Sequence, residues 1–166
     1  MTTYLAAFLA LAAAAAAPTP PPACAAPGHH QFDFWIGKWD VFDAKTGERA
    51  GSSFIESLYG GCALRENWSE PGFTGGSLNI FADGRWHQTW VDQAGALREF
   101  VGGISDGKMI LVAHTHAPQA PDKTVLVRMT FTHDADGTVR QYSDFSKDDG
   151  ATWGFRYDYL YKPAAR

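Results

Sequence analysis

Apolar and polar residues alternate along most of the chain after residue 31, and no stretch there repeats apolar residues at helical spacing. Runs of β-branched and aromatic residues instead recur roughly every 8 to 12 residues, a spacing typical of an all-β sandwich or barrel. The runs lie near residues 38–43, 52–59, 62–68, 76–81, 85–92, 97–102, 108–114, 124–133, 138–146 and 152–161. The pattern therefore predicts short strands and little helix.

Short turn sequences separate these runs. Glycine tolerates the positive φ that tight hairpin turns demand, so dipeptides containing glycine mark such turns. They are Gly60-Gly61, Asp83-Gly84, Ala94-Gly95, Asp106-Gly107 and Asp136-Gly137. We expect consecutive strands to pair as antiparallel neighbours.

The first 25 residues differ in composition from the rest. Residues 4–17 are almost all Ala, Leu and Phe, a proline cluster follows, and no charged side chain occurs before Asp33. This predicts a secretory signal peptide, cut between Ala25 and Ala26 and followed by a flexible tail over 26–31. Lipid attachment at Cys24 is the alternative.

Removal of residues 1–25 leaves 166 − 25 = 141 residues, which suits one domain. It also removes Cys24, so Cys62 is expected to be a lone, buried thiol without a disulfide. The net charge of −4, with acids and bases interspersed, disfavours nucleic acid and anionic membranes as partners. We expect a periplasmic or secreted protein with no membrane insertion after cleavage.

The segment FDFWIGKW, residues 32–39, resembles the Gly-x-Trp opening of lipocalins. In lipocalins, the segment before the first strand plugs one end of the barrel, and the Trp packs against an Arg from late in the chain. The resemblance implies that Trp35 and Trp39 belong to the core. Arg128 and Arg156 are the candidates for the arginine.

The run from FDFWIGKWDV through GCALRENW and RWHQTWVD to SKDDGATW also resembles a family of uncharacterised secreted bacterial proteins of the calycin group. The resemblance implies a single antiparallel up-and-down β-barrel of 8–10 strands over residues 32–163. It implies no particular activity.

Residues 146–153 read S-x-D-x-G-x-T-W and resemble the Asp-box of sialidases and other β-propellers. One copy cannot build a propeller, which needs several blades of about 40 residues each. The motif is a device that stabilises a turn, so we expect it to join the last two strands as a hairpin.

Strand alternation predicts which side chains enter the barrel, because every second residue points to the same face. Two strands each combine apolar residues with one polar group: Leu64, Glu66 and Trp68 on one, and Trp86, Gln88 and Trp90 on the other. Later strands contribute Gln141, Ser143 and Phe145, then Phe155, Tyr157, Tyr159 and Tyr161. An amphipathic interior follows.

Glu66 is the strongest candidate for a functional residue in this interior. A carboxylate on an apolar face either keeps its proton or needs a cationic partner, and we expect Arg128 to be that partner. The two residues could form a structural pair at one end of the barrel. In a catalytic alternative, Glu66 is a general acid or base while Gln88 or Tyr157 polarises a carbonyl.

Metal and haem are weaker possibilities. His114 and His116 are close in sequence and His29 and His30 are adjacent, but a zinc site needs three or four converging ligands. The pattern therefore predicts no metal and no cofactor, with His114 the first candidate if a haem were bound.

The sequence thus predicts an extracytoplasmic protein that binds a small amphipathic molecule inside its barrel. The expected ligand-binding residues are Glu66, Trp68, Gln88, Trp90, Arg128, Gln141 and Tyr157. A small-molecule isomerase or hydrolase on the same barrel, and a purely structural or partner-binding domain, are the alternatives. A lumen filled by its own tryptophans would exclude the binding function.

Overall fold

The computed structural model describes residues 23–117 and 120–165 as ten strands and three short 3-10 turns. The predicted signal peptide lies outside the described residues up to residue 22. The strands are β1 (Gly37–Asp43), β2 (Arg49–Leu58), β3 (Ala63–Glu70), β4 (Phe73–Ala82), β5 (Arg85–Asp92), β6 (Leu97–Ser105), β7 (Lys108–Ala117), β8 (Ala120–His133), β9 (Val139–Ser146) and β10 (Gly154–Pro163). The turns are η1 (Pro27–His30), η2 (Asp33–Trp35) and η3 (Tyr59–Gly61).

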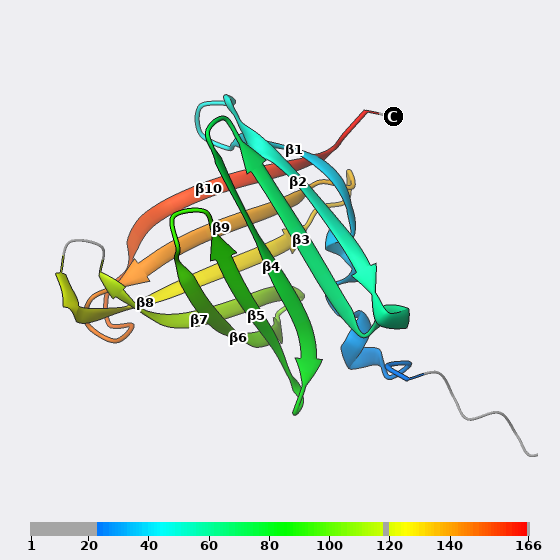
Figure 1. Cartoon of the computed structure of the whole chain (residues 1–166), viewed down its shortest axis with the longest axis horizontal. Helices are drawn as coiled ribbons and strands as arrows, with labels where there is room; N and C mark the ends of the chain where they lie inside the picture. The colour runs from blue at the N-terminus through cyan, green and yellow to red at the C-terminus, as the bar shows by residue number, and fades with distance from the viewer. Residues whose placement is uncertain (1–22, 118–119, 166) are drawn as a thin grey trace, which may run out of the picture.

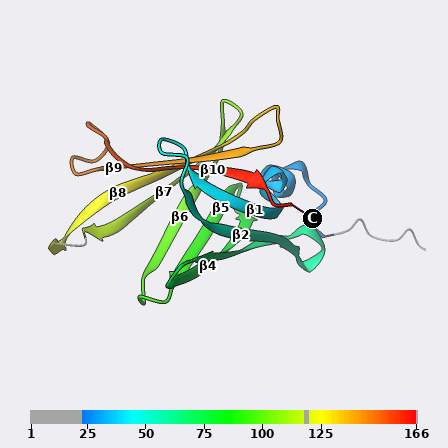
Figure 2. The same ribbon diagram turned by 90° about the horizontal axis from the view of Figure 1, so that it is seen from above.

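Each strand pairs with its neighbour in sequence, and β1 pairs with both β2 and β10, which closes the barrel. The predicted antiparallel up-and-down barrel is therefore confirmed. In Figures 1 and 2, β8, β9 and β10 form one wall, and β2 and β4 lie across from them. None of the helical turns in the described residues has the length and apolar character needed to span a bilayer.

The glycine turns form as the sequence predicts. Gly60, Gly84, Gly95, Gly107 and Gly137 all have φ between 69° and 83°, inside the left-handed region. Because only glycine adopts this conformation at little cost, these positions set the hairpin register.

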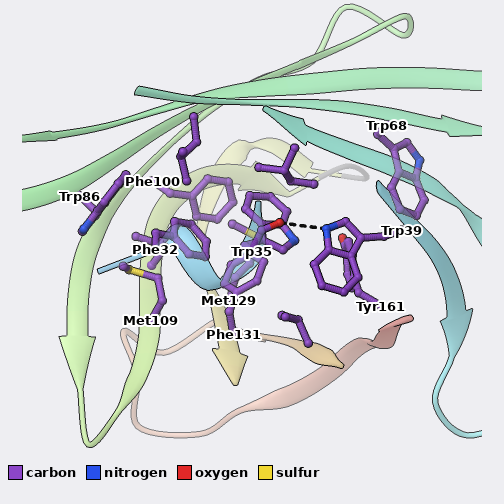
Figure 3. Close-up of a cluster of buried hydrophobic side chains, with 14 of the residues drawn as sticks. Phe32, Trp35, Trp39, Trp68, Trp86, Phe100, Met109, Met129, Phe131 and Tyr161 are labelled. Carbon is purple, nitrogen blue, oxygen red and sulfur yellow. Dashed lines mark hydrogen bonds between the residues drawn. The ribbon is translucent and has the colours of Figure 1, made fainter. Parts of the chain in front are cut away.

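Residues 27–35, which comprise η1 and η2 and are called the plug below, fill one end of the barrel. Phe32 and Trp35 have no exposed surface and stack at 4.9 Å between ring centroids. Figure 3 shows them surrounded by Trp86, Phe131 and other core side chains. The indole N–H of Trp39 donates to the carbonyl oxygen of Trp35 at 2.9 Å, so Trp35 and Trp39 are core residues, as expected.

A disulfide joins Cys24 to Cys62, so the prediction of a lone Cys62 is wrong. It failed because it assumed that Cys24 is removed with the signal peptide. The bridge ties the chain just before the plug to the start of β3, and it uses the sulfur that lipid attachment would require. A cut between Ala25 and Ala26 would sever Cys24 from the barrel's backbone. Within the expected tail, residues 27–30 form η1, where His29 packs edge-on against Phe81.

The Asp-box forms the predicted hairpin between β9 and β10. The carboxylate of Asp148 accepts from the Ser146 hydroxyl at 2.7 Å and from the Thr152 amide at 2.8 Å, while the Gly150 amide donates to the Ser146 hydroxyl at 2.8 Å. Hydrogen bonds from the Thr152 and Ser146 side chains lower the pKa of Asp148 to about 2. The indole of Trp153 closes the turn by donating to the Gly150 carbonyl.

One strand departs from the expected alternation. The β9–β10 register shifts between Phe155 and Tyr157, so Arg156 is an extra residue in a β-bulge. Phe155 therefore lies outside the barrel against Tyr142, at 6.1 Å between ring centroids, while Tyr157 points inward. The prediction that Phe155 shares the inner face is wrong, because a bulge inverts alternation on one side of it.

Candidate functional site

A pocket of about 280 Å³ lies inside the barrel, at the end opposite the plug. It is lined by Glu66, Trp68, Glu70, Phe73, Gln88, Trp90, Asp92, Arg98, Phe100, Met129, Gln141, Arg156, Tyr157, Tyr159 and Tyr161. Its mouth lies near the β3–β4 and β5–β6 turns, whereas Phe100, Met129 and Tyr161 belong to both the pocket and the hydrophobic core. The lumen is therefore filled at one end and hollow at the other.

Large aromatic rings make up the walls of this pocket. Trp68 stacks on Tyr159 at 5.8 Å, and Tyr159 stacks on Tyr157 at 4.7 Å, both with nearly parallel rings. The indole of Trp90 lies over Gly75 of β4, where a Cβ atom would come within 2.5 Å of the ring. The absence of a side chain at Gly75 thus lets Trp90 lie close to the wall.

Glu66 is a buried carboxylate that lines the pocket, and its residue is only 6% exposed. It lies on β3 between Leu64 and Trp68, as strand alternation predicted. Ser77 of β4 donates to its Oε2 atom at 2.8 Å, and Ser53 of β2 contacts its Oε1 atom at 3.4 Å. The neighbouring strands thus supply two hydroxyl groups and no charge.

The direction of the hydrogen bonds around Glu66 is fixed by a backbone carbonyl. The side-chain nitrogen of Asn79 donates to the Leu64 carbonyl at 3.3 Å and to the Ser77 hydroxyl at 3.0 Å. Because that hydroxyl accepts from Asn79, its own proton is free to point at Glu66. Gln88 extends the chain by donating its amide nitrogen to the Asn79 oxygen at 2.8 Å. The network therefore orients the Ser77 hydroxyl so that it donates to the Glu66 carboxylate.

Burial raises the pKa of Glu66 to about 7, and the hydrogen bonds from Ser77 and Ser53 limit that rise. Among residues 23–117 and 120–165, no Lys, Arg or His comes within salt-bridge distance of its oxygens. Removal from water disfavours the charged form, and nothing of opposite charge compensates. Glu66 can thus hold or release a proton close to neutral pH.

A second polar group lies across the pocket on β9 and β10. The Tyr161 hydroxyl donates to the Gln141 oxygen at 2.6 Å, and the Gln141 nitrogen donates to the Tyr157 hydroxyl at 3.1 Å. Burial raises the pKa of Tyr157 to about 12 and that of Tyr161 well above its usual value. Both tyrosines therefore stay neutral and can act as hydrogen-bond donors or acceptors.

The pocket mouth carries charged groups in two different situations. Asp92 accepts from the Trp90 indole at 3.0 Å, lies 3.5 Å from Arg98, and also accepts from turn amides. Burial would raise the pKa of Asp92, but these hydrogen bonds outweigh burial and lower it.

Arg156 on the bulge is exposed and lies over the Tyr157 ring at 5.3 Å, with no salt bridge to any described residue. Arg156 is thus an exposed cation at the pocket mouth.

Arg128 lies away from this site, so its expected pairing with Glu66 is wrong. Val127 and Met129 are buried in the barrel, which turns Arg128 to the outside. There its guanidinium pairs with Asp144 through bonds of 3.0 and 2.6 Å and lies 3.8 Å from the Trp153 ring.

Neither candidate arginine packs against Trp39. That residue pairs with Pro163 near the end of β10, whereas Arg156 lies near the start of the same strand, and Arg128 is held at the Asp-box hairpin. The lipocalin-like arrangement of tryptophan and arginine is therefore replaced by the hydrogen bond from Trp39 to Trp35.

The structure brings six of the seven predicted ligand-binding residues to the pocket: Glu66, Trp68, Gln88, Trp90, Gln141 and Tyr157. Sequence reasoning missed the hydroxyl groups of Ser53 and Ser77, because serine is equally common on both faces of a strand. It also missed Phe73, Phe100 and Met129. Their inward alternation was present in the sequence, but only the closed barrel shows which apolar residues line the pocket.

The histidines do not assemble a metal site. His114 and His116 on β7 are exposed, which places them outside the lumen where a haem would sit. Within the described residues, no three side chains of His, Cys, Asp or Glu converge as metal ligands would.

Fold and pocket together define a small antiparallel barrel with a partly polar internal cavity. No family model matches this chain, and no curated protein matches it either.

Proposed function

We propose that this chain is an extracytoplasmic protein that binds a small amphipathic molecule in the pocket. The observation that carries the proposal is the buried Glu66 at the base of an aromatic-walled cavity of about 280 Å³. Binding sites for small molecules are typically concave and mostly apolar, with a few converging polar groups, and occupy about 300 to 1,000 Å³. This pocket is just below that range and suits a compact ligand.

The Cys24–Cys62 bridge supports a location outside the cytoplasm, since disulfides persist in oxidising compartments. The resemblance to secreted calycin-group proteins favours the same location. Expression with the full N-terminal segment, followed by fractionation, would test this part of the proposal separately.

Native mass spectrometry of the protein isolated from expressing cells tests the binding function. Gln88→Ala alters the pocket, while Thr89→Ala changes the next residue on the same strand, which points outward. We expect a co-purifying small molecule on the wild type and on Thr89→Ala, and a large loss on Gln88→Ala. Equal retention by both variants would place the ligand elsewhere.

A second candidate function is catalysis by Glu66, an isomerase or hydrolase acting on the bound molecule. It is favoured by the burial of Glu66, which raises the pKa of this carboxyl group to about 7, a value that suits a general acid or base near neutral pH. The neutral phenols of Tyr157 and Tyr161 could then polarise a carbonyl. Loss of turnover with retained affinity in Glu66→Gln would support this candidate, and unchanged ligand after prolonged incubation would oppose it.

A further inference from the structure

The shell of Glu66 is built for an anion but supplies no cation. Both described partners of its oxygens are neutral hydroxyl groups, and the Ser77 hydroxyl is oriented toward the carboxylate by Asn79. Hydrogen bonds to a charged group only partly offset the removal of a carboxylate from water. The missing component is a positive charge next to Glu66.

The walls around this carboxylate also suit a cation. The Trp68, Tyr159 and Tyr157 rings form one stack, and Trp90 lines the same cavity. The faces of such rings carry negative potential and attract organic cations, most strongly for tryptophan. An aromatic enclosure with an acid at its base is more favourable for an ammonium group than for a neutral or anionic one.

We propose that the ligand is an organic amine whose protonated nitrogen enters the pocket first and pairs with Glu66. This inference rests on the binding function proposed above and names the chemical class of its ligand. The apolar part of the amine lies among the aromatic walls. Arg156 at the mouth disfavours a second positive charge there and would accept an anionic group on the outer end of the ligand.

The groups that face Glu66 are neutral, so a bound cation would be the main stabiliser of its ionised form. Its neighbours are the hydroxyl groups of Ser53 on β2 and Ser77 on β4, the Gln88 amide on β5 and the phenols of Tyr157 and Tyr161 on β10. The charged groups of the pocket are Glu70, Asp92, Arg98 and Arg156 near its mouth. Since burial keeps the pKa of Glu66 at about 7, an ammonium ion binds the ionised form and its affinity rises with pH.

The test compares two probes of the same size, 2-phenylethylamine and 2-phenylethanol, by calorimetry on the full chain. At pH 8 we expect the amine to bind about ten- to a hundredfold more tightly than the alcohol, the size of a hydrogen-bonded charge contact. Glu66→Gln should remove that preference, whereas Glu99→Gln, at an exposed carboxylate on the outer face of β6, should keep it. With the wild type, amine affinity should rise from pH 5.5 to 8, a measurement that requires no variant.

Equal affinities for the two probes, or amine binding that is flat or weaker at higher pH, would overturn the amine assignment. If neither probe binds and the co-purifying molecule has no amine, the ammonium inference fails while the binding function stands. If neither probe binds and no molecule co-purifies, both proposals fail.

Discussion

The two ends of this barrel use the same strands for opposite purposes. At the plug end, Phe32 and Trp35 complete a hydrophobic core in which their rings pack against those of Trp86 and Phe131. At the pocket end, the rings of Trp68 and Trp90 stand against the walls and leave space between them. The difference arises from an added segment: the chain before β1 fills one end, and nothing in the described residues fills the other.

The comparison also separates two kinds of polar group. The plug end contains few buried polar side chains, although the indole nitrogens of Trp35 and Trp86 have no partner there. The pocket end contains a continuous hydrogen-bonded series from Gln88 through Asn79 and Ser77 to Glu66. The unpaired indole nitrogens thus lie at the plug end, whereas the buried hydrogen-bonded network lies at the pocket end.

The largest expected effect is on the plug. Trp35→Ala removes a fully buried ring and should lower the free energy of unfolding by about 3 to 5 kcal/mol, as large-to-small core substitutions do. Trp68→Ala should cost less, because Trp68 borders a cavity that already exists. Urea denaturation of both variants measures this difference, and equal losses would mean that the two ends contribute alike.

Next in size is the disulfide. Cys24→Ser with Cys62→Ser frees the chain before the plug, and the 38-residue separation of the cysteines predicts a loss of about 4 kcal/mol from loop closure alone. Most of the added mobility should be near η1. Hydrogen exchange should rise first around His29 and Phe81, and an increase centred on the pocket mouth would contradict this assignment.

A smaller effect concerns Glu66 and pH. Its pKa rises from 4.5 in the unfolded chain to about 7 in the fold, so the folded state binds the proton more tightly. The stability from this site is complete below about pH 4.5 and is lost as pH rises through about 7, a change of about 3 kcal/mol. Glu66→Gln lacks this dependence.

The stability of Glu66→Gln relative to wild type should therefore increase by about that amount between pH 4.5 and 8. Denaturation curves of the two proteins across this range provide the measurement. All other titrating groups are common to both, so parallel pH profiles would show that folding does not raise the pKa of Glu66.

The smallest expected change in stability comes from Gly75→Ala. The new methyl group would meet the Trp90 ring at 2.5 Å and push it into the cavity, at a cost of about 1 to 3 kcal/mol for overpacking. Ligand affinity should fall more than stability does. The matched substitution Gly103→Ala meets no atom within 4 Å and should alter neither, as thermal melts and ligand titrations can show.

The ten strands could be predicted because alternation and glycine turns act locally. The same alternation placed Glu66 and Gln88 inside correctly. It could not identify Ser53 and Ser77 as the partners of Glu66, because that depends on the register between β2, β3 and β4. Arg128 was misassigned for a related reason: the face of a strand is known only once one of its residues is known to be buried.

The sequence did not predict the disulfide or the bulge, for two different physical reasons. The Cys24–Cys62 bridge depends on the chain before the barrel being present in the fold, which the predicted cleavage excluded. The bulge at Arg156 inserts one residue, and a single extra residue inverts an alternating pattern without leaving a signal in composition.

Because Arg156 is an inserted residue, the charge at the entrance of the cavity can change without a change at Glu66. Deleting Arg156 would restore a regular ladder while Phe155 stays outside and Tyr157 stays inside, because these two residues already occupy successive rungs opposite Asp144 and Ser143. One codon could thus add or remove a positive charge at the opening without disturbing the acid at the base. Under the proposed binding function, selection of a ligand at the opening could therefore change separately from its contact with Glu66.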